Sequence, residues 1–191
     1  MEDQLPPYYF RSFARPDLRM VARWLRTPEV VRWWGDPEEQ EALVTHDLDE
    51  PLMRQWIVEH EHCPFAYAQA HPAHAWPQAH LAHLPDGTAV IDAFIGDPAM
   101  LGHGHGRGFL RHLAKMLLVE GAPVVAIDPA LDNHRARRAY AHAGFVGERV
   151  VETENGLAVL MLFFSNITRL RFCAPATLSF RRNVRSRRKP T

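Results

Sequence analysis

A run of alternating glycines, from Gly102 to Gly108, has the composition of an anion-binding loop. It follows an apolar stretch and precedes an amphipathic one, so it is expected to join a strand to a helix. Glycines let the backbone approach an anion closely, and the free N–H groups of the first helical turn point toward it. The spacing differs from the G-x-G-x-x-G of dinucleotide-binding folds, and the Gly-Lys-Ser/Thr of a Walker loop is absent. The run is therefore suited to binding a pyrophosphate. Taken alone, it also fits a flexible turn that binds nothing.

A second set of residues shares one face of an expected helix. Asn133, Ala136, Arg137 and Tyr140 are spaced by three and four positions. Asn133 can cap the start of this helix, and Gly144 can end it. Tyr140 therefore projects from one fixed side, where its hydroxyl can donate to a leaving group; packing in the core is the alternative.

Two aspartates are associated with apolar stretches. Asp92 lies inside the stretch 88–95, where burial of an unpaired carboxylate is costly. We therefore expect it either to form a structural ion pair or to act in a functional site. Asp128 follows the β-branched stretch 123–127 and precedes Pro129, which fits a site residue, a strand-end turn or a helix cap. A carboxylate can orient an ammonium group and accept its proton, directly or through water.

The rest of the sequence predicts the elements that position these residues. Strands are expected over 8–13, 53–59, 65–70, 88–95, 123–127, 148–153 and 157–164, with a hairpin turn at Glu154-Asn155-Gly156. Helices are expected over 16–25, 38–46, 106–120 and 133–143. Thr27-Pro28 should end the first helix, and a short segment ending in Trp33-Trp34-Gly35 follows. Residues 71–87, rich in Pro, His and Ala, are expected to form a functional loop.

Composition narrows the class of protein. The 191-residue chain is 47% hydrophobic and 23% charged, with no run of 18 apolar residues, so a globular, cytoplasmic protein without a membrane span is expected. Cys63 and Cys173 fit neither a disulfide framework nor a metal-ligand spacing.

Charge is distributed unevenly along the chain. Residues 165–191 carry eight basic residues and no acid, and are expected to form a poorly ordered basic tail or, alternatively, a binding module. A single domain is expected over 1–164. These residues include 14 basic and 22 acidic ones, and the net charge of −8 favours a cationic small molecule over nucleic acid.

The glycine loop and the tyrosine helix, in this order and with a helix and a strand between them, resemble the GCN5-related N-acetyltransferases (GNAT). The resemblance covers roughly residues 8–164. In that family the motif Arg/Gln-x-x-Gly-x-Gly/Ala binds the coenzyme A pyrophosphate, and Gly104 and Gly106 match it. Leu101 occupies the Arg/Gln position, so binding is expected to rest on the backbone amides of 102–106. The resemblance implies a mixed α/β (α+β) fold, with a mostly antiparallel central sheet, helices on both faces and a splayed middle for coenzyme A.

Within the family the chain is most similar to the aminoglycoside 6′-N-acetyltransferases. The matching segments are VRWWG (31–35), AYAQ (66–69), VIDAF (90–94), and IDP (127–129) followed by Asn133. The resemblance implies that Asp92 orients or deprotonates the amine, that Tyr140 donates to the thiolate of coenzyme A, and that a strand N–H near Phe94 or Ile95 polarises the thioester.

The resemblance also assigns the remaining site residues. Acetyl-CoA is expected to contact Phe94, Ile95, Gly102, His103, Gly104, His105, Gly106, Arg107, Asn133, Ala136 and Tyr140. The acceptor is expected to contact Trp34, Tyr67, Gln69, Asp92 and Asp128. Of the neighbouring tryptophans, Trp33 and Trp34, one is expected in the core and one at the site.

The expected activity is acetyl transfer from acetyl-CoA to a primary amine, foremost the 6′-amine of an aminoglycoside antibiotic, which would confer resistance. A monomer or homodimer with no metal, nucleic-acid or membrane partner is expected. A siderophore-type N-acyltransferase acting on a lysine-like amine or a polyamine is the first alternative. Such relatives typically carry His where this chain has Asp92, and they lack a tyrosine at position 140. A non-catalytic coenzyme A–binding module, whose basic tail contacts nucleic acid, is the second.

Four histidines in the expected loop follow the pattern H-x2-H-x5-H-x2-H, at positions 71, 74, 80 and 83. Such a set can bind a metal ion, but it lacks cysteines and a nearby acid cluster. Incidental positions in the loop are therefore the favoured interpretation.

Overall fold

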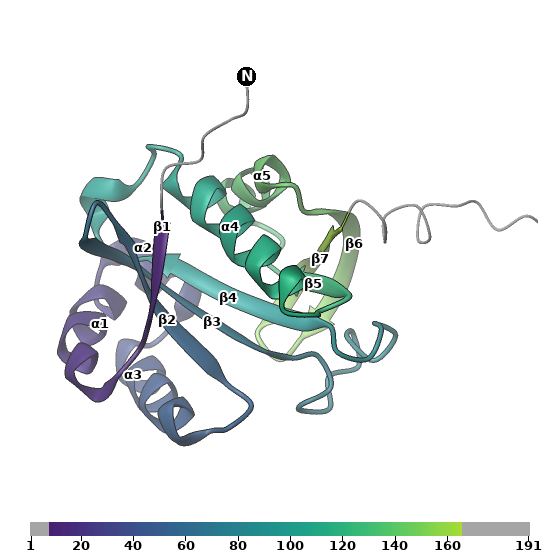
Figure 1. Ribbon diagram of the computed structural model, residues 1–191, viewed down its shortest axis with the longest axis horizontal. Helices are drawn as coiled ribbons and strands as arrows, with labels where there is room; N and C mark the ends of the chain where they lie inside the picture. Colours follow the sequence, from purple (N-terminus) through teal and green to yellow (C-terminus); the bar gives the residue numbers. More distant parts are fainter. Residues whose placement is uncertain (1–7, 166–191) are drawn as a thin grey trace, which may run out of the picture.

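Seven strands form one sheet, in the order β1-β2-β3-β4-β5-β7-β6, in the computed structural model, which describes residues 8–165 (Figure 1). The strands are β1 (Tyr8–Ser12), β2 (Arg54–His60), β3 (Cys63–Pro72), β4 (Ala89–Ile95), β5 (Val124–Ile127), β6 (Val146–Thr153) and β7 (Gly156–Phe164). Strands β4 and β5 pair in parallel and the other neighbours pair antiparallel. The expected mixed, mostly antiparallel sheet is confirmed. The expectations for the basic tail and for Cys173 concern residues that, apart from Ser165, lie outside the described range.

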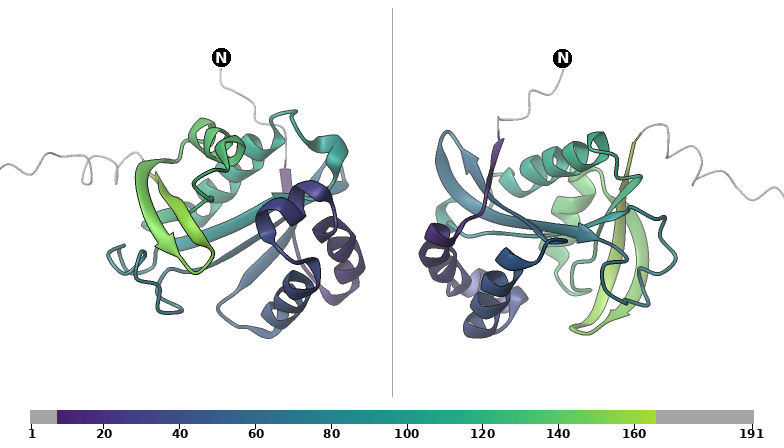
Figure 2. Two further views of the ribbon diagram at one scale, coloured as in Figure 1. Left: turned by 180° about the vertical axis from the view of Figure 1, so that it is seen from behind. Right: turned by 60° about the horizontal axis from the view of Figure 1, so that its bottom comes forward.

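Helices cover both faces of the sheet (Figures 1 and 2). Helices α1 (Leu18–Leu25), α2 (Pro28–Trp34) and α3 (Pro37–His46) lie on one face, and α4 (His105–Val119) and α5 (His134–Ala143) lie on the other. Short 3-10 turns occupy Arg15–Asp17, Asp47–Asp49 and Pro98–Met100. Within residues 8–165, no helix combines the length and apolar character needed to cross a membrane.

Helix α4 packs on the sheet through the apolar face that its sequence predicts. Phe109, Leu110, Leu113 and Leu117 are all buried there. Gly108 lies on the same side, and a Cβ atom at this position would come within 2.6 Å of the Tyr8 ring. The close approach of α4 to β1 therefore requires a residue without a side chain.

The segment after Thr27-Pro28, for which the sequence analysis predicts no element, is helix α2. Thr27 has extended backbone and Pro28 is the first helical residue, a position where proline is favoured. The helix ends at Gly35, whose φ is 86°. The dipeptide thus ends one helix and starts the next, and it places Trp33 and Trp34 on a helix.

Residues 73–88, between β3 and β4, are anchored to the sheet although they form no long element. Leu81 and Leu84 are buried in a cluster with Val90, Ala126 and Leu160. The chain is pinned further by the Ala73 N–H, which donates to the Thr88 carbonyl at 2.8 Å. The loop is therefore held in place by apolar burial at its centre and a backbone bond at its base.

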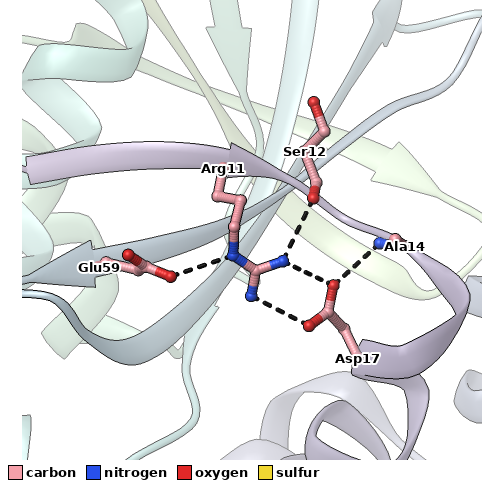
Figure 3. Close-up of polar contacts among 5 residues, drawn as sticks. All are labelled: Arg11, Ser12, Ala14, Asp17 and Glu59. Carbon is pink, nitrogen blue, oxygen red and sulfur yellow. Dashed lines mark hydrogen bonds and ion pairs between the residues drawn. The ribbon is translucent and has the colours of Figure 1, made fainter.

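Arg11 joins β1 to β2 and to the start of α1 (Figure 3). Its Nε donates to Glu59 at 3.0 Å, and its two terminal nitrogens donate to the two oxygens of Asp17 at 2.8 and 3.0 Å. The Ala14 N–H also donates to Asp17, at 3.0 Å. Burial raises the pKa of Asp17, but the bonds from Arg11 and Ala14 outweigh it, so that the pKa lies below its ordinary value.

Asp17→Asn is expected to lower the free energy of unfolding at pH 7 by about 1 kcal/mol, because it removes the charge from a two-bond ion pair. A carboxylate with a lowered pKa stabilises the fold above the unfolded-state value of about 4 and loses that contribution as the pH falls through the folded-state value. The difference from wild type should therefore shrink only below about pH 4. Urea unfolding, followed by tryptophan fluorescence, measures both.

Asp49→Asn is the matched control. Asp49 also pairs with one arginine, Arg15, at 2.8 Å, but the two side chains are 73% and 63% exposed. Its loss of stability should be much smaller. Equal losses in the two variants would contradict a structural role for the Arg11 cluster.

Candidate active site

The sheet opens between β4 and β5. Their pairing is limited to Ala89 with Val125 and Val90 with Ala126, and β5 ends at Ile127 while β4 continues to Ile95. Among residues 8–165, the second half of β4 therefore has a strand on one side only, which is the splayed middle that the family resemblance implies.

The open edge of β4 carries backbone donors that no strand in the described part of the chain uses. The Gly96 N–H donates to Phe65 on β3 at 2.8 Å, and N–H directions alternate along a strand. Phe94 therefore directs its N–H toward β3, whereas Ala93 and Ile95 direct theirs to the open side. Of the two residues expected to polarise a thioester, Ile95 has the suitable orientation.

A cavity of about 580 Å³ lies along this edge, next to the N-terminus of α4. All eleven residues expected to contact acetyl-CoA line it: Phe94, Ile95, Gly102, His103, Gly104, His105, Gly106, Arg107, Asn133, Ala136 and Tyr140. We call this the cofactor cavity. Leu101 also lines it, so the residue that departs from the family motif still faces the same space.

The glycine loop presents backbone amides to the cofactor cavity. Gly102 and Gly104 have φ values of 84° and 83°, in the left-handed region that favours glycine. Gly104 caps α4, so the N–H groups of the first three helical residues, His105, Gly106 and Arg107, have no acceptor within the helix. Amides grouped at a helix N-terminus bind a phosphate oxygen well.

Positive side chains reinforce this end of the cofactor cavity. Arg107, Arg135 and Arg138 line it, and the acid among its lining residues, Glu29, is paired with Arg135 at 2.7 Å. The amides and the arginines fit the pyrophosphate of coenzyme A.

The ring of His105 contributes little charge to this site. Its Nδ1 is 3.0 Å from the Tyr8 hydroxyl, and the ring packs on His60 and Phe65. Burial, and then the neighbouring His60 and His103, lower its pKa, so the ring is neutral at pH 7. His105 therefore contributes to anion binding through its backbone N–H.

A second cavity, of about 770 Å³, lies beyond the open edge, and we call it the acceptor cavity. Trp34, Gln69, Asp92 and Asp128, four of the five residues expected to contact the acceptor, line it. Its charge is opposite to that of the cofactor cavity, since the described residues that line it include three carboxylates, of Asp92, Asp128 and Glu154, and one arginine, Arg32. An acidic cavity suits a cationic ligand.

The two cavities share five lining residues: Trp33, Trp34, Ala93, Asn133 and Tyr140. The phenol of Tyr140 thus lies where the cavities meet. Burial, and then Asp92 and Asp128, raise its pKa well above the ordinary value, so the hydroxyl is protonated at neutral pH. No side chain among residues 8–165 forms a hydrogen bond with this hydroxyl, which remains available as a donor.

A row of polar side chains supports Asp92 across three strands. Gln55, Gln69 and Asp92 occupy paired positions on β2, β3 and β4. Gln55 donates to the Tyr67 hydroxyl at 2.8 Å, Tyr67 donates to Gln69 at 2.8 Å, and Gln69 donates to Asp92 at 3.4 Å. This chain begins at the Val44 carbonyl, which accepts from Gln55 at 3.1 Å.

The placement of Tyr67 changes the role expected for it. The side chain is fully buried, lines neither cavity and uses its hydroxyl within the polar row. Tyr67 therefore fixes the position of Gln69 through a hydrogen bond instead of lining the acceptor cavity. Gln55 is the other buried member, and no sequence pattern marks it, because an isolated glutamine in a strand gives no signal by itself.

Both acceptor-side carboxylates have raised pKa values. Burial raises the pKa of Asp92, and His71 and Gln69 oppose the rise only in part. Burial, and then Asp92, raise the pKa of Asp128 to about 6, while His80 lowers it. Two neighbouring buried carboxylates bind a proton more strongly than exposed ones do. This property suits side chains that accept protons from a substrate.

The four histidines of the H-x2-H-x5-H-x2-H pattern have different partners, and the first, His71, lies in β3 instead of the expected loop. His71 contacts the Pro72 carbonyl at 2.9 Å, His74 pairs with Asp86, and His83 is 3.3 Å from Arg149. His80 pairs with Asp128 at 2.9 Å. Within residues 8–165, no three His, Cys, Asp or Glu side chains are grouped as metal ligands.

The tryptophans are not divided between core and site as expected. Trp33 and Trp34 both line both cavities and both are partly exposed. Trp34 also packs edge-on against Phe94, with ring centroids 4.8 Å apart, while the Arg32 guanidinium lies over Trp33. The structure adds Trp76 to the acceptor cavity, from the loop whose detailed path the sequence does not predict.

Comparison with known proteins agrees with this geometry. The family model described as "Acetyltransferase (GNAT) domain" matches residues 14–153. Aminoglycoside N(6′)-acetyltransferases type 1 from Klebsiella pneumoniae and Serratia marcescens are each 28% identical over 163 residues, which cover 80% of this chain and 80% of each relative. A crystal structure of aminoglycoside acetyltransferase AAC(6′)-Ib with coenzyme A and kanamycin has a TM-score of 0.76 at 26% identity, covering 88% of this chain and 100% of that one.

Gly104→Ala is expected to raise the KM for acetyl-CoA about tenfold, because a side chain at positive φ strains the cap and redirects the amides of the loop. Coenzyme A binding by calorimetry should weaken in parallel.

Gly121→Ala is the matched control, since Gly121 also has positive φ and open surroundings but lies at the far end of α4. It should lose a similar amount of stability and keep its acetyl-CoA affinity. Weakened binding in both variants would contradict the assignment of the loop.

Proposed function

Because the chain belongs to the acetyltransferase (GNAT) domain family and is an acetyl-CoA-dependent N-acetyltransferase, we propose that its acceptor is the 6′-amine of an aminoglycoside antibiotic. The observation that carries the proposal is the acidic acceptor cavity, which meets the basic cofactor cavity at Tyr140 and the tryptophan pair. Acetylation of such an amine would protect the cell from the drug.

The acceptor cavity suits a polyamino sugar in size and lining. Its volume of about 770 Å³ exceeds what a single lysine-like side chain needs. Indole rings offer flat faces to sugar rings, and the amides of Gln40, Gln69 and Asn155 can bond hydroxyl groups. The carboxylates of Asp92 and Asp128 supply charge for ammonium groups. The named relatives are aminoglycoside acetyltransferases, which supports the same class.

The reaction requires a neutral amine, and Asp92 is the group that we assign to this step. It orients the acceptor ammonium and accepts its proton, directly or through one water. Its raised pKa makes it a stronger base than an exposed aspartate. It must be ionised to act, so activity should fall as the pH decreases through the titration of the carboxylate pair.

Acetyl-CoA supplies the thioester whose acetyl group moves to the amine. The new bond joins the amine nitrogen to the acetyl carbon, and the carbon–sulfur bond breaks. The N–H of Ile95, on the open edge of β4, is oriented to bond the thioester oxygen. The Tyr140 hydroxyl donates to the departing sulfur, so the thiolate does not leave uncompensated.

Thiol release with acetyl-CoA and kanamycin tests the function directly. Wild-type protein should release coenzyme A faster with kanamycin or tobramycin than without, and mass spectrometry should show a single acetyl group at the 6′-amine. Release at the drug-free rate for every aminoglycoside tested would overturn the proposal.

Asp92→Asn should lower kcat for kanamycin at least about 100-fold, because it removes the proton acceptor while keeping the size of the side chain. Since burial raises the pKa of Asp92, its ionised form destabilises the fold at neutral pH, and this cost falls only as the pH drops below the folded-state pKa. The variant should therefore be at least as stable as wild type at pH 7 by urea unfolding. A folded variant that keeps the wild-type kcat would contradict the assigned role.

Tyr140→Phe should lower kcat about 100-fold with little change in the KM for acetyl-CoA, since it removes one hydroxyl used in the transition state. Tyr9→Phe, at a side chain that is 63% exposed, is the control and should behave as wild type. An increase confined to KM would instead assign Tyr140 to cofactor binding alone.

A further inference from the structure

The carboxylate of Asp128 is bonded to His80, a residue that does not itself line the acceptor cavity. Its Oδ2 lies 2.9 Å from Nε2 of His80, and the two side chains are only 17% and 8% exposed. Asp128 lines the acceptor cavity, whereas His80 does not. The imidazole therefore contacts the carboxylate from within the protein and leaves its cavity side free.

The position of His80 is fixed by its neighbours in the loop. Leu81 is fully buried beside it, and Leu84 is buried one turn further on. The Leu81 N–H donates to Gln78 at 3.0 Å, and the Leu84 N–H donates to Leu81 at 2.9 Å. These contacts hold the imidazole against Asp128 without help from a ligand.

We propose that His80 is a positioning residue for the acceptor: it holds Asp128 ionised and oriented, so that the remaining oxygen lone pairs receive an acceptor ammonium. The inference rests on the proposed function, because it assigns an amine to Asp128. This role explains how the loop between β3 and β4 contributes to the acceptor site: its His80 supplies a hydrogen-bond donor to Asp128.

The electrostatic surroundings explain why Asp128 needs this partner. Burial, and then the neighbouring Asp92, raise its pKa, while the electrostatic attraction of the His80 imidazole and, to a smaller extent, its hydrogen bond oppose that rise. The other titratable or charged residues that share the cavity come from β3, β4, α2, α5 and the β6–β7 turn: His71, Asp92, Arg32, Tyr140 and Glu154. Without the imidazole, Asp128 would be protonated over more of the neutral range and would lose its attraction for a cation.

Three variants separate this role from simple packing. His80→Leu removes the donor and places an apolar side chain of similar size at the same position in the loop. His80→Gln keeps an N–H donor at the position of Nε2. His74→Leu removes a loop histidine that is paired with exposed Asp86 and does not contact Asp128, and it serves as the control.

The first readout uses no substrate. Carbon-13 NMR of aspartate Cγ follows the titration of Asp128 in the full chain, with its signal assigned by loss in Asp128→Asn. The pKa of Asp128 should rise by about one unit in His80→Leu, rise less in His80→Gln, which keeps the hydrogen bond but not the attraction of the imidazole, and stay near the wild-type value in His74→Leu. An unchanged pKa in His80→Leu would overturn the proposal.

The second readout is the KM for kanamycin as a function of pH. A one-unit rise from about 6 predicts that the KM of His80→Leu exceeds that of wild type about threefold at pH 6.5 and hardly at all at pH 8.5. The KM for acetyl-CoA should not change. His80→Gln should give a profile between those of wild type and His80→Leu, and an increase in KM that is equal at all pH values would overturn the proposal in favour of a purely structural loop.

The two readouts also separate this inference from the proposed function. If the Asp128 titration shifts as expected but no variant, wild type included, acetylates kanamycin, the positioning of Asp128 by His80 is supported and the aminoglycoside assignment fails. If kanamycin is acetylated but the titration of Asp128 does not shift in His80→Leu, the aminoglycoside assignment is supported and the positioning role of His80 fails.

Discussion

The short parallel pairing of β4 with β5 is the constraint on which the rest of the site depends. Two residue pairs join the strands, and beyond them no other strand of residues 8–165 pairs with β4 on that side. That opening creates the cofactor cavity, exposes the N–H groups of Ala93 and Ile95, and places the N-terminus of α4 beside them. A fully paired sheet would satisfy those donors and leave no space for a ligand. The fold therefore forgoes hydrogen bonds in the centre of its sheet to gain a binding site.

Separation of charge follows from which elements meet at the opening. The glycine loop and the first turns of α4 and α5 bring arginines and free amides to the cofactor cavity. The carboxyl end of β5 and the middle of β4 bring two aspartates to the acceptor cavity. A polyanionic donor and a cationic acceptor are thus attracted to adjoining cavities, and they meet at Tyr140.

Keeping carboxylates inside a sheet has a structural cost that other residues reduce. Asp92 receives a bond from Gln69, which is supported in turn by Tyr67 and Gln55. Asp128 is bonded to His80 from the loop. Both groups retain raised pKa values despite these bonds. The supports therefore fix the orientation of the carboxylates without removing their basicity, as a proton-accepting site requires.

The sequence by itself determined the strands and every α-helix except α2, and through its resemblance to the GNAT family it also determined the fold class and most of the site. Periodic apolar residues marked α4, Asn133 and Gly144 marked the ends of α5, and the glycine run marked an anion-binding loop. These signals are local, since they depend on propensity and spacing within a few residues. The family resemblance that these motifs carry assigned eleven residues to the cofactor, and all eleven line one cavity.

Only the tertiary structure decided contacts between distant segments. It buried Tyr67, turned the His105 ring toward Tyr8, and brought both Trp33 and Trp34 to the junction of the cavities. It also joined His80 to Asp128 across 48 positions of sequence. Such contacts depend on sheet register and on how a loop packs, and no local pattern encodes them. The residue types at the site could be read from the chain, but their orientations and protonation states depend on which neighbours the fold supplies.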